Sequence, residues 1–122
     1  MRTTALIVSL ALVSCSGALT AELKTTVVAP KGRLNIELFN DSLEDASWSY
    51  CDQAWFIELE DGTRERDPTR GYCALDSTLL FGANDIEITA PERAGRFFVV
   101  LTVTQGRRSK VELIVGPLDV QP

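Results

Sequence analysis

Residues 97–115 read FFVVLTVTQGRRSKVELIV, two runs rich in β-branched and aromatic residues on either side of a polar turn. This composition predicts two β-strands joined as a hairpin. A three-residue loop, residues 106–108, would set Val103 opposite Val111, whereas a two-residue loop would set Val103 opposite Lys110. Because a slip of one residue moves every side chain to the other face of a sheet, the pattern favours the three-residue loop. The same register gives two further apolar pairs, Leu101 with Leu113 and Val99 with Val115.

Shorter runs upstream also predict strands. Residues 33–39 and 54–60 alternate apolar with polar side chains, which is the pattern of a strand with one buried face. Asp61-Gly62 follows the second run and signals a hairpin, and the all-polar return arm, residues 63–66, suits a sheet edge. Further strands are expected at residues 23–28 and around Ile86 and Ile88. About seven strands without helical periodicity predict an all-β fold, a small antiparallel β-sandwich.

The first residues have the pattern of an export signal. Arg2 gives the start a positive charge, and residues 5–13 are mainly apolar but too few to span a bilayer, which takes about 20 residues in a helix. The segment Leu12-Val13-Ser14-Cys15 resembles the lipobox of bacterial lipoproteins. The resemblance implies a signal peptide over residues 1–14 and lipid attachment at Cys15. Two or three acyl chains on that cysteine would hold the protein stably on a membrane.

The same resemblance implies a location. Ser16, rather than an acidic residue after the cysteine, implies sorting to an outer membrane, so the domain would face the periplasm or the exterior of a bacterial cell. An ordinary signal peptidase cut after Ala18 is the alternative, because small residues also stand at the offsets which that enzyme needs. That cut would discard Cys15 and give a soluble periplasmic or secreted protein. The lipobox interpretation is preferred.

The chain is expected to divide into three parts: a signal peptide at residues 1–14, a lipidated tether at 15–22 and one β-sandwich domain at 23–122. Without the signal peptide, which contains Arg2, 11 basic residues face 17 acidic ones, a net charge of −6. This acidic excess argues against a nucleic-acid partner.

Cys51 and Cys73 are the thiols that remain in the mature domain by either route of export. In an oxidising compartment they are expected to form a disulfide, worth about 3 kcal/mol in the chain-entropy model. Their spacing is far from C-x-x-C, and the chain has no histidine with which to complete a zinc site. No metal or other cofactor is therefore expected.

Several stretches resemble bacterial immunoglobulin-like domains of secreted proteins and lipoproteins. They are LNIELFNDS at 34–42, Tyr50-Cys51, Tyr72-Cys73 and AGRFFVV at 94–100. The resemblance implies an immunoglobulin-like sandwich and brings no catalytic residues with it. Two departures are the Ala94-Gly95 pair, where the family often has Pro-Gly, and a cysteine spacing too short for the antibody-type disulfide.

The sequence holds no motif for catalysis. Histidine is absent, and so are a G-x-S-x-G elbow and a phosphate-binding glycine loop, so we do not expect an enzyme.

Two features are candidates for binding. Arg64, Arg66 and Arg70 could contact an anion or acidic partner, although a solvated charged edge is the preferred interpretation.

The second feature is the strand at residues 97–101, which is apolar on both faces. Phe98 and Val100, together with Ile114, would form a contact patch unless other parts of the chain cover them. Coverage by the N-terminal strand or a neighbouring loop is the preferred interpretation.

These observations predict an envelope lipoprotein that acts as a non-catalytic protein-binding or assembly module. The membrane and an envelope protein are the expected partners, and the oligomeric state is left open. The alternative is a periplasmic inhibitor or immunity protein that blocks a hydrolase with an exposed loop, for which residues 63–73 are the best candidate.

Overall fold

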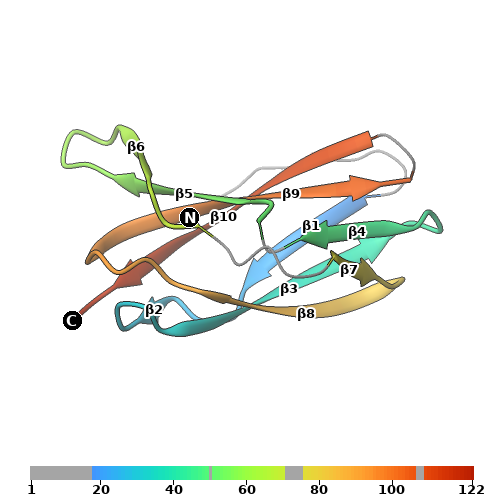
Figure 1. The fold of residues 1–122 in the computed structure, drawn as a ribbon, viewed down its shortest axis with the longest axis horizontal. Coiled ribbons are helices and arrows are strands. Elements are labelled where there is room, and N and C mark those ends of the chain that lie inside the picture. The colour runs from blue at the N-terminus through green and yellow to red at the C-terminus, as the bar shows by residue number, and fades with distance from the viewer. Residues whose placement is uncertain (1–17, 50, 71–75, 107–108) are drawn as a thin grey trace, which may run out of the picture.

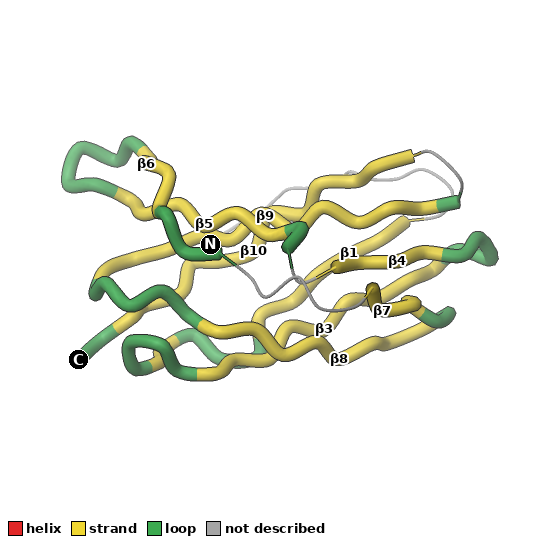
Figure 2. Tube along the Cα trace, in the orientation of Figure 1, coloured by secondary structure: helices red, strands yellow, loops and turns green. Residues whose placement is uncertain are grey.

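The computed structural model describes residues 18–49, 51–70, 76–106 and 109–122. Within these ranges the regular structure consists of strands alone (Figure 2). The strands are β1 (Ala18–Leu23), β2 (Val27–Val28), β3 (Arg33–Asp41), β4 (Ala46–Ser49), β5 (Gln53–Glu58), β6 (Arg64–Asp67), β7 (Asp76–Leu79), β8 (Gly82–Thr89), β9 (Gly95–Gln105) and β10 (Ser109–Val120). The all-β prediction is confirmed, but ten strands replace the seven expected. The described residues contain no helix that is long and apolar enough to cross a bilayer.

The strands form two sheets. The smaller sheet has the order β1-β3-β8, and all its pairs are antiparallel. In the larger sheet β10 lies between β2 and β9, and the far edge of β9 pairs with β5 along its first half and with β4 near its end. β6 extends the sheet beyond β5, and β7 extends it beyond β4. Figure 1 shows the two sheets as layers, with β3 and β8 in one and β5, β9 and β10 in the other.

The core lies between the two sheets because the longer strands of both have one apolar face. From the smaller sheet, β3 contributes Leu34, Ile36 and Leu38, each at most 2% exposed. From the larger sheet, Trp55 is fully buried and its ring meets that of Phe97 edge-on, with centroids 6.2 Å apart. The remaining strongly buried core side chains include Trp48, Ile86, Ile88, Val99, Leu101, Val103, Leu118 and Val120.

The β9–β10 hairpin has the register that the sequence predicted. Val103 pairs with Val111, Leu101 with Leu113, Val99 with Val115 and Gln105 with Ser109, which is the register that the longer loop required. The alternation buries Val99, Leu101 and Val103 against the core, as the pattern of residues 97–104 required.

The N-terminal region differs from the prediction. β1 pairs with β3 along all six of its residues, from Ala18 with Asp41 to Leu23 with Ile36. Residues 18–22, assigned above to a tether, therefore belong to the folded part. The run at 23–28 is not one strand, because β1 ends at Leu23 and the short β2 joins the other sheet, parallel to β10.

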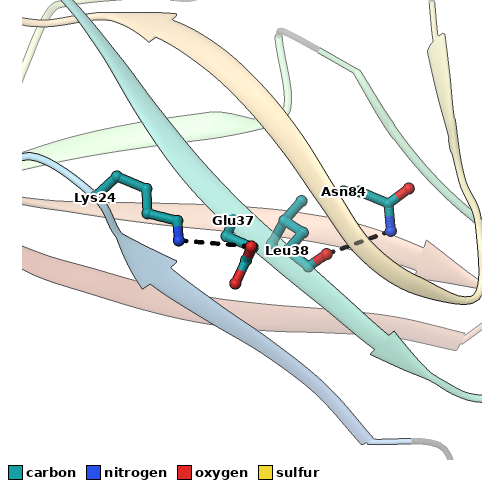
Figure 3. Close-up of polar contacts among 4 residues, drawn as sticks. All are labelled: Lys24, Glu37, Leu38 and Asn84. Atoms are coloured by element: carbon teal, nitrogen blue, oxygen red, sulfur yellow. Dashed lines mark hydrogen bonds and ion pairs between the residues drawn. The ribbon is translucent and has the colours of Figure 1, made fainter.

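The outer face of the smaller sheet is mainly polar, although Phe39 on β3 is 41% exposed there. Lys24 Nζ lies 3.5 Å from Glu37 Oε2, between the end of β1 and β3, and Arg33 pairs with Glu87 between β3 and β8 at 3.6 Å (Figure 3 shows the first pair). On the opposite, inward side of β8, in phase with Ile86, Asn84 Nδ2 donates to the carbonyl oxygen of Leu38 at 3.3 Å, also drawn in Figure 3. Such exposed ion pairs contribute at most about 1 kcal/mol each, so they add little to the stability of the fold.

Candidate binding face on the larger sheet

The outer face of the larger sheet carries a strip of apolar side chains from three strands. Phe56 on β5 pairs with Phe98 on β9, and Ala54 pairs with Val100. On the other side of β9, Val100 pairs with Ile114 on β10, whose side chain is 65% exposed. These residues point away from the core because they alternate with buried Trp55, Val99 and Val115.

Two arginines from β6 lie over the aromatic rings of this strip. The Arg64 guanidinium carbon is 3.7 Å from the Phe98 ring centroid, and that of Arg66 is 5.8 Å from the Phe56 centroid. Both distances lie within the range of cation–π attraction, and the shorter one means direct stacking. Phe98 is accordingly only 9% exposed although it sits on the outer face.

A groove of about 410 Å³ runs beside these contacts. Its lining combines an apolar floor with charged rims, and we call it the outer groove. The lining residues are Cys51, Asp52, Gln53, Ala54, Phe56, Arg66, Val100, Thr102 and Glu112. Because Arg66 is basic whereas Asp52 and Glu112 are acidic, the groove suits a partner that places an apolar side chain between polar groups of both charges.

The turn between β5 and β6 is held by internal hydrogen bonds. Gly62 N–H donates to the Leu59 carbonyl at 2.9 Å, and Leu59 N–H donates to the Thr63 carbonyl at 2.8 Å. Asp61 Oδ1 accepts from the hydroxyl of Thr63 at 2.6 Å and from its N–H at 3.0 Å. These bonds stabilise the carboxylate and so lower the pKa of Asp61 below its ordinary value. The bond from the Thr63 hydroxyl makes the larger contribution. The hairpin predicted from Asp61-Gly62 is confirmed.

The structure brings together most of the residues that the sequence named for binding. Arg64 covers Phe98, Arg66 and Val100 line the outer groove, and Ile114 lies beside Val100. Arg70 is exposed beyond the end of β6, and it is not among the groove residues. The expected coverage by the N-terminal strand is wrong, because β1 lies in the other sheet. Phe98 is instead covered by Arg64.

Phe56 is the residue of this face that the sequence analysis missed. It precedes Ile57 in a run that was interpreted as a strand with one buried face, and nothing local shows that its partner is Phe98, 42 positions further along the chain. One feature of the sequence could have indicated it: Ala54 and Phe56 are apolar although they lie on the outward side of this run.

The predicted disulfide involves a residue outside the described ranges. Cys51 is exposed at the edge of the outer groove, and its Sγ lies 3.1 Å from Ser49 Oγ. Cys73 and the predicted lipid attachment site Cys15 both lie outside the described residues. The disulfide therefore stays a prediction.

The described part of the chain offers no cluster of three or more cysteine or carboxylate side chains placed to hold a metal ion.

Comparisons with known proteins add little. No protein family matches the chain, and no curated protein matches it. One solved structure that matches comes from work described as "Structural basis of T cell specificity and activation by the bacterial superantigen toxic shock syndrome toxin-1". That match covers 86% of this chain and 98% of the other, with 8% identity and a TM-score of 0.39.

Proposed function

We propose that the protein is a lipid-anchored protein of the bacterial cell envelope, which binds another protein through the outer face of its larger sheet. The observation that carries the binding role is the outer groove, where the half-buried Phe56 and Val100 are open to a partner and Arg66 forms part of the rim. An apolar floor within a charged rim is the usual arrangement of a protein contact site. The absence of histidine and of catalytic motifs from the sequence supports binding rather than catalysis.

The fold proposed for this domain is an immunoglobulin-like sandwich. Its support is the two-layer arrangement together with the sequence resemblance over residues 34–42 and 94–100. The strand count of ten exceeds the seven to nine strands of the standard immunoglobulin types. Three of these strands, β2, β6 and β7, are short and lie at the margins of the larger sheet.

The lipid anchor rests on the segment Leu12-Val13-Ser14-Cys15. The start of β1 favours the lipobox over a cut after Ala18, because that cut would remove the residue that pairs with Asp41. A Cys15→Ala variant should appear in the soluble fraction, while the unchanged protein stays with the membranes. Retention of the variant on membranes would contradict the anchor.

The binding face is tested by crosslinking in living cells. A photoreactive benzoylphenylalanine at Ile114, 65% exposed beside the outer groove, should give one defined adduct with an envelope protein. The same group at Asp85, exposed on the outer face of the smaller sheet, is the matched control. Equal adducts from both positions, or none from Ile114, would contradict the proposed face. A Val100→Glu change should abolish the adduct by placing a carboxylate on the groove floor.

The inhibitor alternative is favoured by one observation, the hydrogen-bonded turn of the β5–β6 hairpin, whose position beyond β5 is visible in Figure 1. A rigid projecting turn suits an inhibitor because little conformational entropy is lost when it binds. The photoreactive group at Glu60, exposed in this turn, separates the two roles. An adduct with a hydrolase from Glu60, and none from Ile114, would favour inhibition.

A further inference from the structure

Exposed apolar side chains gather on two turns at one end of the sandwich. Leu43, between β3 and β4, is 95% exposed, and Leu80 and Phe81, between β7 and β8, are 69% and 64% exposed. Single exposed hydrophobic residues are ordinary on a protein surface, but three large ones on neighbouring turns are a typical contact site. Residues 77–84, around Leu80 and Phe81, contain no charged residue.

Two asparagines hold both turns in place: Asn40 is buried and Asn84 is half-buried. Asn40, only 1% exposed, donates from Nδ2 to the Leu79 carbonyl at 3.3 Å and accepts at Oδ1 from the Ser42 N–H at 3.1 Å. It thereby links the turn that carries Leu43 to the turn that carries Leu80. Asn84 binds both the N–H and the carbonyl of Leu80, at 2.9 and 2.8 Å. The apolar side chains are therefore presented to solvent by a fixed backbone.

The N-terminal segment enters the fold at the same end. Ala18 pairs with Asp41, the last residue of β3, directly before the turn that contains Leu43. Figure 1 shows the start of β1 at the end of the molecule where the β3–β4 and β7–β8 turns lie. An extended chain spans at most about 3.3–3.6 Å per residue, and three residue steps separate Cys15 from Ala18. A lipid on Cys15 would therefore lie within roughly 10 Å of Ala18.

We infer that this end of the sandwich faces the bilayer, and that Leu43, Leu80 and Phe81 enter its interfacial region. The inference rests on the lipid anchor proposed above, since the anchor holds these turns against the membrane. Apolar side chains placed at the headgroup boundary gain by leaving water. Three acidic residues at the end of β3 and on the β3–β4 turn would stay at the headgroup level and favour a zwitterionic surface: Asp41, Glu44 and Asp45. The outer groove, on a side of the sandwich rather than at this end, would stay open to a partner.

The test places a fluorescent reporter on the turn. The full chain is produced in a bacterium that processes lipoproteins, and the lipidated protein is incorporated into phosphatidylethanolamine–phosphatidylcholine vesicles with brominated acyl chains. A Phe81→Trp variant adds an exposed tryptophan to the buried Trp48 and Trp55. Its additional emission should shift to the blue and be quenched by the bromines. Leu43→Trp provides a second reporter on the neighbouring turn if the first variant does not fold.

Glu92→Trp is the matched control, because Glu92 is exposed beyond the end of β8 opposite Phe81, on the order of 20 Å away. Its emission should be the same with and without bromine. If the protein floats with the vesicles but the Phe81→Trp emission matches this control, the inference is wrong although the anchor stands. If the protein does not float with vesicles, the anchor and the inference fail together. Quenching of Phe81→Trp with an unchanged Glu92→Trp control supports both.

Discussion

The guanidinium carbon of Arg64 lies 3.7 Å from the centre of the Phe98 ring. This contact joins the edge strand β6 to the outer face of the central strand β9. β6 pairs only with β5 among the described strands, so Arg64 reaches across β5 to cover a residue of β9. One long cationic side chain thus covers apolar surface that another strand or loop was expected to cover. Phe98 pairs with Phe56, and Arg64 lies on the same strand as Arg66. Because Phe56 and Arg66 line the outer groove, loss of the Arg64–Phe98 contact is expected to disturb the groove as well.

Truncation of Arg64 should destabilise the domain. Arg64→Ala removes the cation–π contact and exposes Phe98, so we expect a loss of about 0.5–1 kcal/mol in the free energy of unfolding, measured by urea denaturation. Arg66→Ala is the control, because that guanidinium lies 5.8 Å from the Phe56 ring and its loss should be smaller. Equal losses from the two variants would show that the short Arg64–Phe98 distance has no energetic consequence.

The parts of the fold that the sequence predicted are those with strong local patterns. The β9–β10 register followed from Val99, Leu101 and Val103, since any slip would have placed them in solvent. The strands β4 (ASWS) and β7 (DSTL) were missed because four residues with mixed polarity carry no clear period. They form because each pairs with the other, which is a tertiary effect.

The binding face was predicted in part for the same reason. Phe98 and Val100 were identified because a strand that is apolar on both faces is locally visible. Their neighbours Phe56 and Arg66 come from β5 and β6, far away in the sequence, and no local pattern specifies such pairs. Asn40 was also invisible, because a polar residue at the end of a strand usually reaches solvent, whereas this one is buried between two turns.

Removal of the Asn40 side chain should lower the stability of the fold more than the small size of the side chain suggests. Asn40→Ala leaves the Leu79 carbonyl and the Ser42 N–H without these partners, and an unsatisfied buried group costs about 1–3 kcal/mol. Asn35→Ala is the matched control, since Asn35 is exposed on the same strand. Thermal unfolding should show a lower midpoint for Asn40→Ala and little change for the control. An equal effect of both changes would mean that the link between the turns does not stabilise the fold.

Gly116 should not tolerate a side chain. Its φ is +151°, and a Cβ there would lie 2.9 Å from the Phe97 carbonyl oxygen and 2.7 Å from Phe98 Cδ2. Backbone strain and overpacking together predict a loss of about 1–3 kcal/mol for Gly116→Ala, measured by urea denaturation. Gly82→Ala separates the two causes, because Gly82 has φ +97° but open space where the Cβ would go. If the two variants lose the same stability, the contact with Phe97 and Phe98 is not the cause.

The predicted Cys51–Cys73 disulfide can be tested by counting thiols. The mature protein, unfolded without reductant, should take up no alkylating reagent at either position. In a Cys73→Ala variant the reagent should label Cys51, which mass spectrometry detects. The free energy of unfolding of this variant should be lower by about 3 kcal/mol. A Thr78→Ala change, at an exposed position on β7, controls for a nonspecific effect on stability. Labelling of Cys51 in the oxidised, unchanged protein would contradict the disulfide.

The Asp61–Thr63 turn gives a prediction for pH. Hydrogen bonds from the Thr63 hydroxyl and N–H lower the pKa of Asp61. The stabilisation is therefore complete above the ordinary pKa of an aspartate, and it is lost as the pH falls through the lowered value. Thr63→Ala removes the hydroxyl but keeps the N–H, so the pKa of Asp61 should rise towards its ordinary value without reaching it.

An NMR titration of the Asp61 side-chain carboxyl carbon measures this change directly, with Thr78→Ala as a threonine change far from the turn. If the titration of Asp61 were the same in Thr63→Ala as in the unchanged protein, the hydroxyl could not be the main cause of the lowered pKa. The turn would then owe its rigidity to the backbone bonds between Leu59, Gly62 and Thr63. A rise in the pKa would instead show that the Thr63 hydroxyl helps to fix the tip of the β5–β6 hairpin, the segment that the inhibitor alternative requires to be rigid.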